Sequence, residues 1–123
     1  MKINRWNPCQ ITDAIFCVSS YSHGMAEGTL LHPRLEEPKE IRSIPQLIVE
    51  LNDILNREDV PVQKQVFSAA AAKENCIATF RIQVLFMEHY TWQGRLVWEE
   101  RKIEAAFQSV LELILIIDEI LSE

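Results

Sequence analysis

Glycine, proline and long apolar runs are all scarce in this sequence. Its 123 residues include three glycines and five prolines, which excludes collagen-like and low-complexity classes. There is no glycine-rich phosphate loop and no G-x-S-x-G nucleophile motif, so neither nucleotide binding nor serine hydrolysis is indicated. The longest apolar stretch, 110–121, contains three acidic residues and is shorter than the roughly 20 residues of a membrane-spanning helix. These absences predict a protein outside the membrane, without a cofactor and without enzymatic activity.

Cysteines are also few, and their number is odd. Cys9, Cys17 and Cys76 show no C-x-x-C spacing, which is typical of reduced, buried thiols in a cytoplasmic protein rather than of a disulfide framework or a zinc site. Residues 1–8 contain no apolar segment of the kind that signal peptides carry, so no signal peptide is expected. We therefore expect a cytoplasmic location.

Positive charge is the scarcer sign. Twelve Lys and Arg residues against eighteen Asp and Glu residues give a net charge of −6, which opposes binding to nucleic acid and to anionic membranes. A basic partner would be easier to accommodate. With 48% hydrophobic residues, a chain of this length can bury one core, and we expect residues 1–123 to form a single domain.

The sequence does contain an internal repeat. When the chain is shifted by 66 residues, eight of the 33 positions from 23 to 55 are identical without a gap, whereas average residue usage gives about two or three by chance. The identical pairs are His23 and His89, Gly28 and Gly94, Leu30 and Leu96, Ser43 and Ser109, Leu47 and Leu113, Ile48 and Ile114, Ile54 and Ile120, and Leu55 and Leu121. We infer a duplication with units at about 10–57 and 76–123, joined by residues 58–75.

Each unit is expected to begin with a three-stranded antiparallel meander. Its first strand is rich in β-branched and aromatic residues, and turn residues separate it from a second strand with period-two alternation. A charged turn then precedes a short third strand. The expected strands are 14–21, 28–33 and one ending at Ile41 in the first unit, and 78–87, 92–100 and one ending at Phe107 in the second.

A helix is expected to close each unit. Ser43 and Ser109 have the character of N-caps because Gln46 and Glu112 follow three residues later, the spacing of a capping box. Apolar residues then recur at helical spacing, in the first unit to about Arg57. The predicted fold class is α+β, with tandem βββα repeats related by a pseudo-twofold axis and helices packed on one face of antiparallel sheet. The sequence leaves open whether the six strands form one sheet or two.

The second unit carries a distinctive string of residues. WQGRLVWEE at 92–100 and FQSVLELILIID at 107–118 resemble the C-terminal signature of a group of small uncharacterised bacterial proteins, W-Q-G-x-x-x-W-x-E followed by F-R-S-x-x-E-L-x-x-x-I-D. This sequence has Gln108 where that signature has Arg, although Arg42 precedes the serine of the first unit. The resemblance implies a common fold and brings no activity, substrate or cofactor with it.

Histidines and carboxylates are the candidates for metal or catalytic chemistry. His23 and His89 hold equivalent turn positions, and a pseudo-twofold axis could bring them together as metal ligands. Inheritance from one ancestral turn explains the same pattern, so we assign no metal, cofactor or catalytic residue. The carboxylate pairs are interpreted as solvated surface rather than as general acids and bases. They are Glu36-Glu37, Glu99-Glu100 and Asp118-Glu119.

Candidate interface residues lie on one strand and on the second helix. Trp92, Gly94 and Trp98 share a strand face, which leaves packed core, protein interface and small-ligand binding as alternatives. Leu115 and Ile116 stand where the first helix has Val49 and Glu50. A solvent-facing Ile116 would extend an exposed apolar patch, which a second chain would cover.

These residues favour a non-enzymatic interaction protein that acts as a homodimer, through the second helix or an exposed strand edge, with a further protein partner open. The alternative is a small-ligand-binding or regulatory domain with a pocket between the repeats. Converging polar groups in such a pocket would favour the ligand, and an apolar patch would favour the protein partner. Residues 57–75 folding over the second helix would instead leave a monomer.

Overall fold

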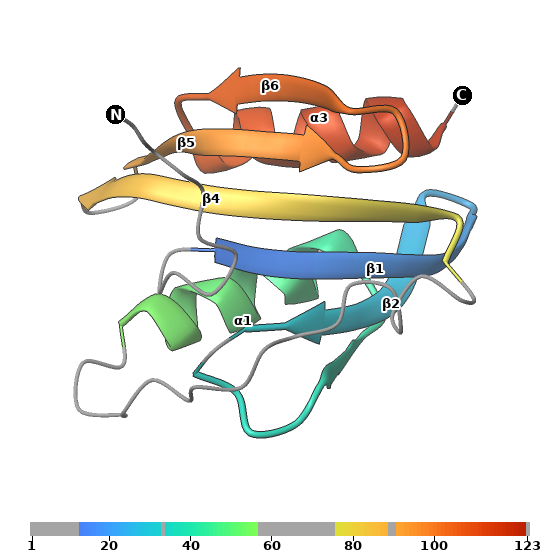
Figure 1. The fold of residues 1–123 in the computed structure, drawn as a ribbon, viewed down its shortest axis with the longest axis horizontal. Coiled ribbons are helices and arrows are strands. Elements are labelled where there is room, and N and C mark those ends of the chain that lie inside the picture. Colours follow the sequence, from blue (N-terminus) through green and yellow to red (C-terminus); the bar gives the residue numbers. More distant parts are fainter. Residues whose placement is uncertain (1–12, 33, 57–75, 89–90, 123) are drawn as a thin grey trace.

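The computed structural model describes residues 13–32, 34–56, 76–88 and 91–122, and at 13, 86–88 and 91 it describes the backbone alone. Three strands and a helix are followed by three more strands and a second helix (Figure 1). The elements are β1 (Asp13–Ser22), β2 (Met25–Leu31), β3 (Lys39–Ile41), α1 (Ile44–Leu55), β4 (Ala78–Glu88), β5 (Thr91–Trp98), β6 (Ile103–Phe107) and α3 (Val110–Leu121).

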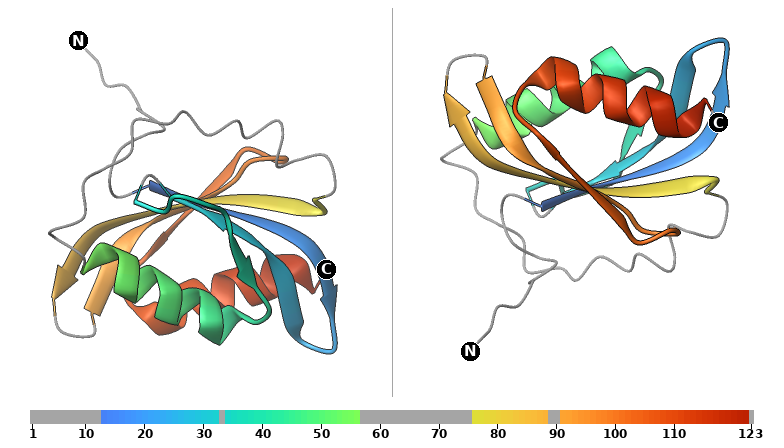
Figure 2. Two further views of the ribbon diagram at one scale, coloured as in Figure 1. Left: turned by 90° about the horizontal axis from the view of Figure 1, so that it is seen from below. Right: turned by 90° about the horizontal axis from the view of Figure 1, so that it is seen from above.

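All six strands form one sheet, in the order β3-β2-β1-β4-β5-β6. Every neighbouring pair is antiparallel, including the central pair of β1 and β4. Both helices lie on the same face of this twisted sheet, as Figure 2 shows from two sides. The α+β class with antiparallel sheet is therefore confirmed, and the question of one sheet or two is answered in favour of one.

The expected strands lie where the residue pattern places them, with shifts at their ends. β2 begins at Met25 instead of residue 28 because the turn before it is only two residues long. Those two residues, His23 and Gly24, both have positive φ, at 55° and 76°, as a tight hairpin turn of type I′ requires. β5 ends at Trp98 instead of residue 100, because the turn 99–102 begins at the next residue. The second expected hairpin turn includes residues 89–90, which lie outside the described residues.

Both predicted helix caps are confirmed. The amide of Gln46 donates to Ser43 Oγ at 3.2 Å, and the amide of Glu112 donates to Ser109 Oγ at 3.1 Å. The reciprocal half of each box differs from the expected one, because the Gln46 and Glu112 side chains accept from the residue before the cap, Arg42 or 108. At each helix start, side chains thus accept hydrogen bonds from two backbone amides.

The core lies between the helices and the sheet. The helix faces predicted to be apolar are the faces that are buried, with Leu47, Leu51 and Ile54 on α1 and Leu113 and Ile117 on α3. Each such side chain contributes about 1.5–3 kcal/mol on burial. Among the described residues, no helix has the length and apolar character needed to cross a membrane.

The cysteines are paired rather than separate. Cys17 in β1 and Cys76, two residues before β4, form a disulfide with Cα atoms 5.8 Å apart, a normal separation for that bond. The expectation of unpaired thiols is wrong for these two residues. The number and spacing of the cysteines did not predict this pair, because β1 and β4 are distant in sequence and meet only in the folded sheet. Cys9 lies outside the described residues.

Candidate functional site: an apolar groove between the two helices

A groove of about 370 Å³ opens between the start of α3 and the middle of α1. Ile48, Val49 and Asn52 line it from α1, Val110 lines it from α3, and Trp92 of β5 lies against it. Four of these five residues are apolar, and Asn52 supplies the only side-chain amide. Among the described residues, the groove lining therefore offers hydrophobic contact and one side-chain amide.

Trp92 joins the groove to the core. Its side chain is only 2% exposed and packs in the core cluster with the helix residues. An aromatic side chain of this size fixes the position of the elements around it. Of the three meanings left open for Trp92, packed core is the one observed, with one edge of the residue facing the groove.

The two helices together form the helix layer of the protein. The most exposed line of side chains on each helix carries large apolar residues followed by an acidic residue. On α3 it runs through Leu111, Leu115 and Glu119, and Leu111 and Leu115 are 64% and 55% exposed. On α1 the line includes Val49, which is 65% exposed, followed one turn later by Asp53. Large apolar side chains exposed beside an apolar groove are typical of an interaction surface.

Ile116 is less exposed than a solvent-facing position implies. Its side chain is half-buried and packs against the core of its own chain, and its role in an interface stays a prediction. The equivalent position in α1, Glu50, lies 3.8 Å from Lys39 of β3. Shifting both partners by 66 residues gives Ala105 and Ile116, so an ion pair in one half corresponds to two apolar residues in the other. The asymmetry between the helices is thus accommodated within the chain.

Gly94 and Trp98 also lie away from the groove. A side chain at Gly94 would overlap the carbonyl of Gln83 and the ring of Phe107, so the close approach predicted there is that of the protein's own backbone. Trp98 is half-buried, and the Arg101 guanidinium lies 5.1 Å from its ring centre, a cation–π distance. Of the five interface candidates, Trp92 lines the groove and Leu115 is exposed on α3.

The histidine candidates do not form a site in the described part of the chain. His23 is an exposed turn residue, and His89 lies outside the described residues. Among the residues that the structure describes, no three His, Cys, Asp or Glu side chains are grouped to hold a metal ion.

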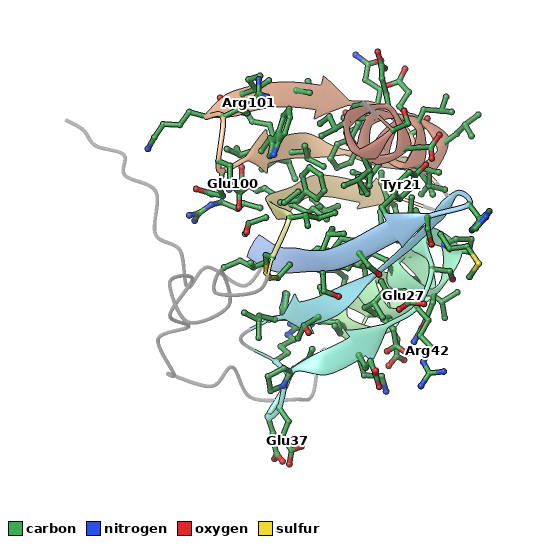
Figure 3. The ribbon with its side chains drawn as sticks, turned by 90° about the vertical axis from the view of Figure 1, so that its right-hand side faces the viewer. Tyr21, Glu27, Glu37, Arg42, Glu100 and Arg101 are labelled. Atoms are coloured by element: carbon green, nitrogen blue, oxygen red, sulfur yellow. A yellow bond between two sulfur atoms is a disulfide. The ribbon has the colours of Figure 1, made fainter. Side chains whose placement is uncertain are left out.

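Three of the six paired carboxylates have partners within the protein, and one of these three, Glu100, is also exposed. Glu99 forms an ion pair with Arg81 at 2.8 Å, and Glu100 accepts from the amide of Thr79 at 2.8 Å. Asp118 accepts a hydrogen bond from Tyr21. Glu36, Glu37 and Glu119 are exposed as expected, and Figure 3 shows Glu37 projecting from the body of the protein. The partners of the others are distant in sequence, which is why charge patterning alone did not reveal them.

Tyr21 connects the end of β1 to α3, and Figure 3 shows it beneath that helix. Its hydroxyl donates to Asp118 Oδ1. This hydrogen bond, followed by desolvation and the charge of the carboxylate, raises the pKa of Tyr21 above its ordinary value of 10.0. The position of Asp118 corresponds, at the 66-residue offset, to Asn52 in the groove.

We expect Tyr21→Phe to lower the free energy of unfolding at neutral pH, because the Asp118 carboxylate loses a donor. Since folding raises the Tyr21 pKa, this contribution is fully present below pH 10.0 and is lost as the pH rises through the folded-state pKa. Urea unfolding of both proteins across this range, with Asp118→Ala as the matched variant, measures the difference. A difference that grows with pH would contradict the assignment.

Comparison with known proteins adds no relative: no family model matches the chain, and neither the curated proteins nor the solved structures contain a match.

Proposed function

We propose that this chain is a non-enzymatic interaction protein whose binding surface is the helix layer around the groove. The observation that carries the proposal is the exposure of Val49, Leu111 and Leu115 on the two helices, together with a groove that Val49 lines and whose described lining is apolar except for Asn52. Leaving such residues in water is unfavourable by about 25 cal/mol for each Å² that a partner would cover. The cytoplasmic location expected from the sequence depended partly on unpaired thiols, and the Cys17–Cys76 disulfide removes that part of its support.

A small-ligand pocket between the repeats is the alternative, and its location has support. The groove takes Ile48, Val49 and Asn52 from the first half of the chain and Trp92 and Val110 from the second. A small ligand, however, is normally oriented by several placed polar groups, and Asn52 alone supplies a side-chain amide among the described residues that line the groove. The chemistry of the groove therefore favours a protein partner.

Self-association is proposed through β6, which is an edge strand of the sheet formed by the described residues. β6 is five residues long, and its one hydrogen-bonded neighbour among those residues is β5. Its one charged residue, Glu104, is held by Arg95 of β5 at 2.9 Å. The other edge, β3, has three residues of which two are charged, a composition that discourages pairing. Two β6 strands joined about a twofold axis would extend the sheet across a homodimer.

The tandem pseudo-twofold repeat is likewise an inference. It is supported by features that recur 66 residues apart: a register irregularity in β1 after Val18 and in β4 after Val84, facing Gly28 and Gly94, and the two serine caps. The β1–β4 pair at the centre of the sheet is where a twofold axis between two βββα units would pass.

Photo-crosslinking in living cells tests the proposed function. A photoreactive residue replaces Val49 or Leu115 on the helix layer, Ile103 on β6, or Ile77, a control that is 57% exposed. We expect positions 49 and 115 to give the same adduct with another protein, and position 103 to give a covalent dimer of twice 14.3 kDa. Adducts at 49 and 115 no stronger than at 77 would contradict the interaction surface. A monomer at position 103 would contradict the homodimer.

A further inference from the structure

We propose that β6 pairs with β6 of a second copy of this chain about a twofold axis that passes beside Ala105. This rests on the proposed function, which assigns self-association to β6, and it adds the residues that meet. In this register Ala105 faces the same residue of the second copy. The other opposite pairs are Glu104 with Ala106 and Ile103 with Phe107.

The outer side of β6 is open to a further strand. β6 is the outermost strand of the described sheet (Figure 1), and among the described residues its backbone pairs with β5 alone. A charged side chain on an edge strand normally discourages pairing with another chain. The one charged side chain of β6, Glu104, lies 2.9 Å from Arg95 of β5, so its charge is compensated within the sheet.

The identity of the two strands limits how they can pair. Two copies that meet through the same edge of their sheets run antiparallel. Opposite residues then point to the same face of the joined sheet, and side chains alternate along each strand, so the axis passes beside a residue rather than between two. Within the five residues of β6, only axes beside positions 104, 105 and 106 bring more than one residue of each strand into pairing.

Pairing length and charge select Ala105 from these three positions. An axis beside Ala105 pairs all of 103–107, whereas an axis beside residue 104 pairs only 103–105 and one beside residue 106 pairs only 105–107. An axis beside Glu104 would also set this carboxylate directly opposite itself, and like charges in that position destabilise a strand pair. With the axis beside Ala105, Glu104 instead faces the methyl group of an alanine.

Ile103 gives the paired edge an apolar contact. It lies opposite Trp98 of β5, on the face that carries the helices, and it is 48% exposed. Phe107, on the same face at the other end of β6, is buried in the core. Antiparallel pairing brings the exposed Ile103 of each copy beside the Phe107 end of the other, so both isoleucines lose exposed surface.

The same axis places the two grooves on one side of the dimer. An axis that relates neighbouring antiparallel strands is perpendicular to their sheet, so it leaves both helix layers on the same face. Within each copy the two helices already share one face (Figure 2). A partner with two binding segments can then occupy both grooves, and its binding gains from the second contact.

Disulfide trapping tests the register. In a Cys9→Ser background, which keeps the Cys17–Cys76 bond, Ala105→Cys sets two thiols opposite each other. Opposite Cα atoms of antiparallel strands are about 4.5–5.5 Å apart, within the range of a disulfide. Ala106→Cys is the matched control, because its two copies are diagonal neighbours about 8 Å apart, beyond that range. In a glutathione buffer we expect the variant at 105 to form a covalent dimer at least about tenfold faster than the variant at 106.

A mixing experiment checks the same register from its flanks. Glu104→Cys and Ala106→Cys proteins, each in the Cys9→Ser background, should crosslink slowly when alone. Mixed together, with a tag on one of them, they should form a covalent heterodimer readily, because positions 104 and 106 are opposite. Circular dichroism checks that each variant is folded, and the exposure of Ala106, which exceeds that of Ala105, excludes accessibility as the reason for faster trapping at 105.

The outcomes separate the register from self-association itself. If position 103 photo-crosslinks to a second copy but position 105 traps no faster than position 106, the homodimer stands and this register is wrong. Faster trapping at 104 alone or at 106 alone would move the axis to that residue and would also overturn the proposal, as would an adduct of position 103 with a different protein. If position 105 does not trap and position 103 gives no covalent dimer, self-association through β6 fails as well.

Discussion

Replacing Gly28 or Gly94 with alanine is expected to lower the free energy of unfolding by about 3 kcal/mol or more. A β-carbon at Gly28 would overlap the carbonyl of Cys17 and the Cα of Val18 in β1. At Gly94 it would overlap the carbonyl of Gln83 and the Phe107 ring. The obstacle is mainly backbone in a hydrogen-bonded strand, so it cannot turn aside as a side chain would. Urea unfolding of each variant measures the loss.

Gly24 supplies the matched control. It has φ of 76° in the first hairpin turn, and no atom lies within 4 Å of an added β-carbon. Gly24→Ala should therefore cost only the strain of the left-handed conformation, about 1 kcal/mol. Equal losses for Gly24→Ala and Gly94→Ala would show that close approach of the strands is not what requires glycine at Gly94.

These glycines also show how far the sequence leads. Their 66-residue spacing and the alternation around Gly94 predicted strands and a close backbone approach, and both are observed. The two serine caps and the apolar helix faces were equally readable, because each depends on residues within one or two turns. Local spacing is thus sufficient for most elements of this fold.

Contacts between distant segments were not readable. Arg34 donates to the carbonyl of Ile54 at 2.8 Å and so caps the end of α1 from the β2–β3 loop, and Tyr21 reaches Asp118 across 97 positions. The groove itself depends on where α3 begins beside α1. The partial burial of Ile116 against the core has the same origin, since a helical pattern alone does not show which neighbours a side chain meets.

Breaking the Cys17–Cys76 disulfide is expected to lower the free energy of unfolding by about 4 kcal/mol at 25 °C. The bond closes a loop between cysteines 59 positions apart, so it restricts the unfolded chain strongly. It alters the folded chain little, because Cys17 is buried in β1 and the amide of Ile77 donates to the carbonyl of Val18 at 2.8 Å beside it. Urea unfolding in a Cys9→Ser background, with and without reductant, measures the loss.

The variant Cys17→Ala with Cys76→Ala is the control. It should match the reduced protein in stability and be insensitive to reductant. Two titratable thiols in the oxidised Cys9→Ser protein, or a stability that reductant does not change, would contradict the bond.

The result also bears on the location of the protein, because disulfides seldom persist in a reducing cytoplasm. Against a typical domain stability of about 5–15 kcal/mol, a loss of this size would leave the reduced chain dependent on its core and on bound partners. A ligand that binds only the folded state raises stability by mass action, so a protein bound at the proposed interaction surface should restore part of what reduction removes.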